Sequence, residues 1–130
     1  MSAQRLPPEL ENKIARYQNL QAEYTRVVQE RVAVEAEIAE VRKVLKLLED
    51  LREENAPVYK LESNILVRVD REKVVQELKD RSEILELRLQ KLKKQEEELK
   101  KQLDKVAEEI RSIQSRLTIS KQPSQSGAGG

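Results

Sequence analysis

The sequence predicts a mainly helical protein in which two long helices form an antiparallel coiled coil and a short central β-hairpin joins them. Charged residues make up 38% of the chain and aromatic residues 2%, a composition typical of long helices and coiled coils. Apolar residues follow heptad spacing on both sides of the centre. Between these two runs, residues 57–69 are rich in the β-branched and aromatic types that favour strands.

Missing residue types exclude several function classes. The 130 residues include no Cys and no His, which removes disulfides, thiol chemistry, the most frequent metal ligands and the most frequent general base. The Gly residues are Gly127, Gly129 and Gly130, so no glycine-rich loop precedes a helix to hold a phosphate. We therefore expect no enzymatic activity, no catalytic residue, no metal site and no cofactor.

Charge and hydropathy restrict the partners. The 25 basic and 24 acidic residues are mixed along the chain and leave a net charge of +1. Nucleic-acid binding would instead need Lys and Arg gathered on one face. No apolar run approaches the roughly 20 residues that span a bilayer, and no signal-peptide core follows Met1. We expect a cytoplasmic protein that binds neither nucleic acid nor membranes.

The first helix is expected over residues 8–55. Proline is tolerated in a first helical turn, which suits Pro8, and Pro57 disfavours helical geometry in the residue before it. Arg31 interrupts an otherwise apolar seam, and Leu10 fits the same frame. The seam consists of Tyr17, Leu20, Tyr24, Val27, Val34, Ile38, Val41, Leu45 and Leu48. This regular spacing favours helix over the disorder that a highly charged composition can also indicate.

The second helix is expected over residues 71–118, with Asp70 as its N-cap. Eleven of its thirteen seam positions are apolar, and Ser82 and Glu96 are the exceptions. The apolar positions are Val75, Leu78, Leu85, Leu89, Leu92, Leu99, Leu103, Val106, Ile110, Ile113 and Leu117. Such a sustained period of 3.5 residues predicts a left-handed supercoil. We expect residues 1–118 to form one domain and residues 119–130 a disordered tail.

The two seams have similar lengths, which favours pairing within one chain after the hairpin reverses its direction. Arg31 lies 33 residues before Asn64, and Glu96 lies 32 residues after it. The two charges therefore fall at similar heights in a folded-back coil. Two alternatives remain open. The charges pair with each other, because an unpaired charge in a seam is costly, or each side chain extends outward independently.

The hairpin is the predicted assembly element. A turn at Ser63-Asn64 separates its strands, and Asn64 is expected to supply a positive φ. A lone two-stranded hairpin is marginally stable and has open edges. Both of its faces carry apolar groups that one chain cannot bury: Val58, Tyr59, Leu61, Ile65, Leu66, Val67 and Val69. We expect hairpins of several subunits to join into a larger sheet or barrel.

The hairpin and the start of the second helix resemble the prefoldin family, specifically its beta-type subunit. The similar segments are Val58 to Leu61, Ile65 to Val69, Asp70 to Leu78, Leu85 to Leu89 and Gln95 to Glu97. The family usually carries a glycine in the turn, where this chain has Glu62-Ser63-Asn64. The alpha-type subunit has two hairpins, whereas residues 57–69 are enough for one.

The resemblance implies an ATP-independent chaperone, a hexamer of two alpha and four beta subunits whose strands form intersubunit β-barrels. It further implies that the coiled-coil tips hold non-native polypeptides and pass them to a group II chaperonin. The matching tip positions are Leu6, Leu10, Ile14, Ile110, Ile113, Leu117 and Ile119. The residues alone favour a simpler role for these side chains, which is to complete the coil. The alternative function is a coiled-coil scaffold or tether that holds no client.

Overall fold

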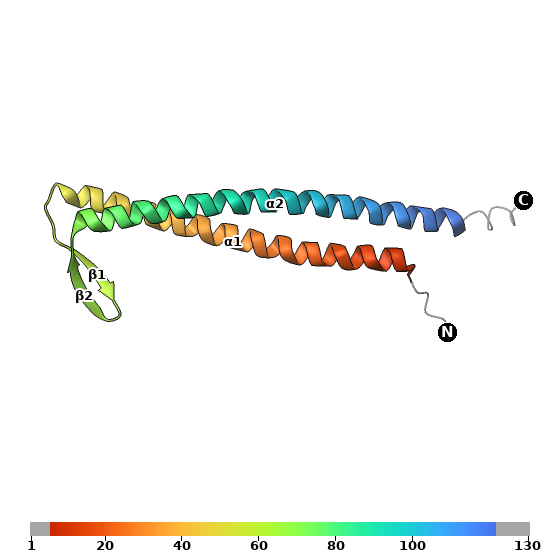
Figure 1. Cartoon of the computed structure of the whole chain (residues 1–130), viewed down its shortest axis with the longest axis horizontal. Helices are drawn as coiled ribbons and strands as arrows, with labels where there is room; N and C mark the ends of the chain where they lie inside the picture. Colours follow the sequence, from red (N-terminus) through yellow and green to blue (C-terminus); the bar gives the residue numbers. More distant parts are fainter. Residues whose placement is uncertain (1–5, 122–130) are drawn as a thin grey trace, which may run out of the picture. The chain divides into compact units, whose positions relative to one another are not determined.

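The computed structural model describes residues 6–121 (Figure 1). The order of elements is α1 (Pro8–Arg52), β1 (Val58–Glu62), β2 (Ile65–Val69) and α2 (Arg71–Lys121). This order confirms the predicted fold class of two long helices with a central antiparallel hairpin. The chain divides into two units, which are described one at a time. The helix-end unit contains described residues 6–28 and 94–121, and the hairpin unit contains residues 29–93.

Helix α1 begins where the sequence predicts and ends earlier. The Glu11 N–H donates to the Pro7 carbonyl at 3.0 Å, so Pro8 opens the helix. The helix ends at Arg52, whereas the sequence predicted residue 55. Asn55 has a left-handed φ of 50°, and its N–H donates to the Arg52 carbonyl at 3.2 Å. A left-handed residue of this kind ends helices, and asparagine tolerates the conformation.

Helix α2 begins at Arg71, and the preceding Asp70 occupies the N-cap position. The Asp70 carbonyl accepts the Val74 N–H at 3.1 Å, which is the first helical hydrogen bond. The helix runs to Lys121, so the predicted disordered tail was wrong for residues 119–121. Loss of the apolar seam does not end a helix, because its backbone hydrogen bonds need no packing partner and these three residues include no Gly or Pro. The rest of the predicted tail, residues 122–130, lies outside the described residues.

In the helix-end unit, α1 and α2 run antiparallel and pack through the predicted seam. Two cross-helix ion pairs show the direction, because Glu9 pairs with Arg116 and the later Lys13 pairs with the earlier Glu109. The buried side chains of this unit are Leu10, Leu20, Val27, Leu99, Leu103, Val106 and Ile113. All of them stand at predicted seam positions.

The hairpin unit repeats this packing with a different set of residues. Its buried side chains are Val34, Ile38, Val41, Leu48, Leu85, Leu89 and Leu92. Glu37 pairs with Arg81 at 2.6 Å, and Glu30 with Arg88 at 3.8 Å, across the antiparallel helices. A fully buried Leu or Val contributes about 1.5–3 kcal/mol, whereas an exposed ion pair contributes about 0–1 kcal/mol. The apolar seam therefore provides most of the stability of this unit.

The charged interruptions of the seam are half-buried. Arg31 donates from Nη1 to Glu35 Oε1 on its own helix at 2.5 Å. Arg31 belongs to the hairpin unit and Glu96 to the helix-end unit. The pairing of Arg31 with Glu96 stays a prediction.

Candidate functional site

The hairpin has two faces that differ in chemistry. Strands β1 and β2 pair antiparallel, with Tyr59 opposite Arg68 and Leu61 opposite Leu66. Directly opposed residues share a face, so these four side chains form what we call the Tyr59 face. The other face, the Val58 face, carries Val58, Lys60, Glu62, Ile65, Val67 and Val69. The Val58 face includes an ion pair between Lys60 and Glu62, at 3.4 Å.

The turn between the strands is built differently from the prediction. Ser63, and not Asn64, has the positive φ, at 54°. Glu62 pairs with Ile65, so the loop has two residues and Ser63 is the first of them. A positive φ at the first central residue alone is the pattern of a type II′ turn, in which glycine is preferred there. The expectation for Asn64 was wrong because the strand register, rather than residue preference, selects the position.

Apolar side chains of the hairpin remain exposed in the single chain. On the Tyr59 face, Leu61 and Leu66 are 66% and 67% exposed. On the Val58 face, Ile65 and Val67 are exposed, while Val58 and Val69 next to the helices are half-buried. The described sheet has two strands, so each strand also has an unpaired edge. Exposed apolar groups beside open strand edges are typical of an interaction surface.

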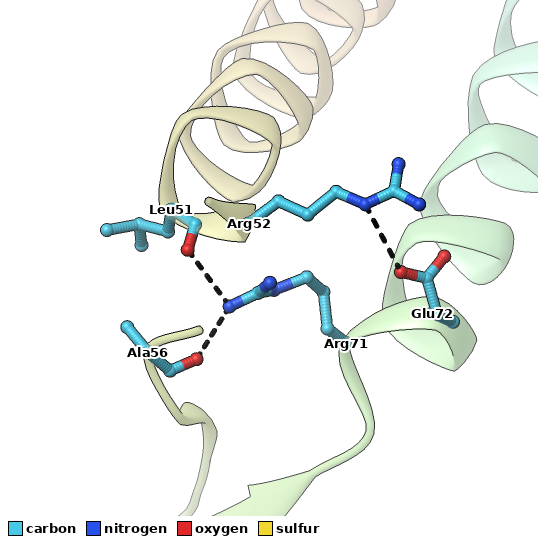
Figure 2. Close-up of polar contacts among 5 residues, drawn as sticks. All are labelled: Leu51, Arg52, Ala56, Arg71 and Glu72. Carbon is cyan, nitrogen blue, oxygen red and sulfur yellow. Dashed lines mark hydrogen bonds and ion pairs between the residues drawn. The ribbon is translucent and has the colours of Figure 1, made fainter. Parts of the chain in front are cut away.

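Arg71 ties the root of the hairpin to both helices (Figure 2). Its Nη2 donates to the Leu51 carbonyl at 3.2 Å and to the Ala56 carbonyl at 2.6 Å. The Leu51 carbonyl belongs to the last turn of α1, where helical partners are missing. Arg71 is itself the first residue of α2. One guanidinium therefore joins the end of α1, the connector to β1 and the start of α2. Within the hairpin unit, the strands project away from the paired helices (Figure 1).

The predicted client-binding residues lie together in the helix-end unit, in three environments. Leu6 and Ile119 are 46% and 61% exposed. Ile14, Ile110 and Leu117 are half-buried. Leu10 and Ile113 are buried, at 2% and 5% exposure. The seven residues thus share one end of the coil, and two of them are closed off from solvent.

Two ion pairs cross between the helices near Leu10 and Ile113. Glu9 and Arg116 are 3.5 Å apart and exposed, whereas Lys13 and Glu109 form a close, half-buried pair. The hydrogen bond from Lys13 lowers the pKa of Glu109 below its ordinary value. Burial opposes this shift in part, and the charges of Lys13, Lys105 and Arg16 add to it. Glu109 is therefore held in its ionised form.

Residues 6–121 contain no cluster of three or more acidic side chains that could hold a metal ion. Within the same residues, no helix is both long enough and apolar enough to cross a membrane.

Comparison with known proteins identifies the family. A family model described as "Prefoldin subunit" matches residues 11–116. A prefoldin subunit beta of Sulfolobus acidocaldarius is 36% identical over 126 residues, which cover 97% of this chain and 96% of that protein. The chain belongs to the prefoldin family. A prefoldin subunit beta of Sulfurisphaera tokodaii is 42% identical over 93 residues, covering 72% of this chain and 74% of that protein.

A solved structure agrees with this assignment. The crystal structure of the prefoldin beta subunit from Thermococcus strain KS-1 matches with a TM-score of 0.74 and 32% sequence identity. The match covers 85% of this chain and 96% of that one. These similarities are to the beta type, as the single hairpin predicted. Prefoldin subunits are chaperone subunits and not a known enzyme family, and they assemble with other prefoldin subunits.

Sequence reasoning missed two features of this prefoldin subunit that a closer look at charge could have found. A cation in the first turn of a helix is unfavourable, because it lies near the positive end of the helix dipole. An arginine at position 71, directly after Asp70, therefore suggests that its side chain makes specific contacts elsewhere. Lys13 stands seven residues before Leu20 and therefore falls on the predicted seam. The partner of each side chain, by contrast, appears only in the folded chain.

Proposed function

We propose that this chain is a beta-type subunit of an ATP-independent chaperone that holds non-native polypeptides and passes them to a group II chaperonin. The observation that carries the proposal is the exposed, open-edged apolar hairpin in a chain of the prefoldin family. Such a hairpin needs partner subunits to cover it, and it leaves the far ends of both helices available for a second task.

Assembly is assigned to the hairpin. We propose that it joins the hairpins of other subunits in a β-barrel, in a hexamer of two alpha-type and four beta-type subunits. A barrel of this kind pairs the open strand edges and buries both faces of the hairpin, and both effects favour assembly. The residues involved are Val58, Tyr59, Leu61, Ile65, Leu66, Val67 and Val69.

Client holding is assigned to the helix ends. Non-native polypeptides expose apolar side chains, which bind other exposed apolar surface by the hydrophobic effect. Leu6 and Ile119 offer such surface in the closed coil. The remaining proposed residues are Leu10, Ile14, Ile110, Ile113 and Leu117, which are buried or half-buried.

One experiment tests both assignments. The chain is mixed with an alpha-type subunit and analysed by size-exclusion chromatography with light scattering, then added without nucleotide to a chemically denatured client protein. A hexamer that suppresses aggregation of the client supports the proposal. A partner-independent filament or simple dimer that leaves aggregation unchanged would contradict it and favour a scaffold.

A truncation separates the two tasks. Removal of the residues before Tyr17 and after Val106 deletes the proposed client-binding ends and leaves the hairpin intact. We expect the truncated chain to assemble like the full chain and to lose most of its suppression of aggregation. Full suppression by the truncated complex would refute the assignment of client holding to the helix ends.

A further inference from the structure

Two of the proposed client-binding side chains are inaccessible in the closed coil. Leu10 is 2% exposed and Ile113 is 5% exposed, so a polypeptide reaches neither of them while α1 and α2 remain packed at this end. Their participation in client holding requires the two helices to part locally. The question is then what holds this end of the helix-end unit closed.

A charged layer stands where the seam should be apolar. Buried Leu20 and Val27 mark every seventh residue of α1, and the same frame places Lys13 on the seam. The Lys13 side chain is 34% exposed, and its partner Glu109 on α2 is 33% exposed. Glu109 Oε2 is itself shielded from solvent. Closure at this layer therefore depends in part on attraction between charges, beside the half-buried Ile14 and Ile110.

A second ion pair lies closer to the chain ends, about one helical turn away on α1 and about two turns away on α2. Glu9 Oε1 and Arg116 Nη2 are 3.5 Å apart. A shallow pocket on this side of the unit is lined by Glu9, Lys13, Glu109, Ser112, Ile113 and Arg116. Its charged lining residues are exposed or half-buried, whereas Ile113 is almost fully buried. The two pairs thus bracket the apolar side chain that they cover.

We propose that the Lys13–Glu109 and Glu9–Arg116 pairs form an ionic latch, which keeps Leu10 and Ile113 buried until the helix ends part to receive a non-native polypeptide. This inference rests on the proposed function. Ion pairs near the surface are weak and are screened by salt, so this end opens more readily than the apolar layers of the same coil. Local opening of a low-stability segment is a common way for proteins to expose a binding surface.

Cross-linking tests whether opening is required. Because the chain has no Cys, the double variant Glu9→Cys, Arg116→Cys can be joined selectively by a short bismaleimide in the assembled complex. The matched control is the same variant capped with N-ethylmaleimide, which blocks the thiols without joining the helices. We expect the joined complex to suppress client aggregation on the order of tenfold less well than the capped complex.

The outcomes of this experiment distinguish failure of the latch from failure of the proposed chaperone function. Equal suppression by joined and capped complexes would overturn the latch and leave the chaperone assignment standing. Absence of suppression by the capped complex and by the unaltered protein would overturn both.

Hydrogen exchange tests the latch without any client. Between about 0.1 M and 1 M salt the screening length falls from about 10 Å to about 3 Å. We expect amide exchange in residues 9–14 and 106–117 to become about threefold faster over this range. The double variant Lys13→Met, Glu109→Met replaces the charged layer by an apolar one and keeps only the Glu9–Arg116 pair, so its exchange should be slower and less dependent on salt. Salt-independent exchange in the unaltered protein, or an unchanged salt response in the variant, would contradict the latch.

Discussion

At the residue scale, Ser63 and Arg71 determine how the hairpin is built and attached. Ser63 adopts a left-handed φ of 54°, which costs a residue with a Cβ about 1–2 kcal/mol. Arg71 donates to two carbonyls from different segments of the chain. Both residues act on the backbone, and neither belongs to the apolar pattern of the strands or helices.

Replacing Ser63 by glycine should stabilise the hairpin. Glycine adopts a positive φ without strain, and its larger loss of backbone entropy offsets part of this gain. We expect Ser63→Gly to raise the free energy of unfolding of the assembled complex by about 0.5–1 kcal/mol per subunit, measured by urea denaturation. Asn64→Gly is the matched control, because Asn64 does not have a positive φ, and it should lower stability instead. Stabilisation by Asn64→Gly alone would contradict the assigned turn.

Replacing Arg71 by lysine should loosen the root of the hairpin. A lysine keeps the charge but lacks the planar guanidinium that reaches both carbonyls. Hydrogen bonds to charged groups contribute about 1.5–3 kcal/mol, so we expect a loss of stability in that range by urea denaturation, with faster amide exchange in residues 53–56. Arg52→Lys is the control, since Arg52 and Glu72 are 4.0 Å apart and exposed. Equal effects of both variants would refute the role of Arg71.

Acid should weaken the helix ends through Glu109. Its pKa is lowered from the ordinary value of 4.5, so the ionised form stabilises the folded state. This contribution is complete above pH 4.5 and is lost as the pH falls through the lower pKa of the folded state. We expect the protection of the amides in residues 106–113, relative to intrinsic exchange at the same pH, to fall over that interval. Glu109→Gln should remove this pH-dependent loss of protection, and the same loss in the variant would show that another group causes it.

At the element scale, the two helices divide their leucines between a buried seam and an exposed outer surface. On α2, Leu85 is 1% exposed whereas Leu87, two residues later, is 71% exposed. The heptad period explains the difference, because two residues correspond to more than half a turn of helix. Leu85 therefore packs against the other helix and stabilises the coil, whereas Leu87 does not.

The pair Leu85 and Leu87 allows a matched test of the seam. Truncating a buried leucine removes its transfer free energy and leaves a cavity, so Leu85→Ala should destabilise the coil by about 2–4 kcal/mol. Leu87→Ala should change stability by less than about 0.5 kcal/mol. Urea denaturation followed by far-UV circular dichroism measures both. Similar losses from the two substitutions would contradict the assigned seam.

At the scale of the whole molecule, the hairpin is the part whose apolar side chains and strand edges are not covered within a single chain. The helices bury their seam within each unit, whereas the strands keep open edges and exposed Leu61, Ile65 and Leu66. In the proposed complex, other prefoldin subunits cover this surface. The stability of the hairpin is therefore expected to depend on the concentration of its partners.

A charge on the hairpin should block assembly without unfolding the helices. Leu66→Glu places a carboxylate on the Tyr59 face, where burial between subunits would leave it unpaired. We expect the partner-dependent complex to be lost in size-exclusion chromatography with light scattering, while the helical circular dichroism of the free chain is retained. Leu87→Glu is the control, because it adds the same charge to an exposed leucine of α2 and should leave assembly intact. Normal assembly of Leu66→Glu would contradict the assembly role of the Tyr59 face.

Local pattern was enough to predict the elements of this protein. Heptad spacing, Asp70 before the second helix and the β-branched residues after Pro57 are signals between neighbours in sequence, so the two helices, the hairpin and the seam were predictable. Helix ends were less so, because Asn55 ends α1 by its backbone conformation and residues 119–121 continue α2 without a seam.

The sequence by itself determined that this chain forms two long helices with one hairpin between them, and it pointed to the family. Only the tertiary structure decided which side chains of the helix-end unit are accessible and which charges meet. Leu6 and Leu10 are equally apolar in sequence, yet one is exposed and the other buried. Lys13 finds Glu109, and Arg71 finds two carbonyls, because folding brings together groups that are distant along the chain. Periodicity predicts which face of a helix is buried, but only the packed partner determines how deeply each residue is covered.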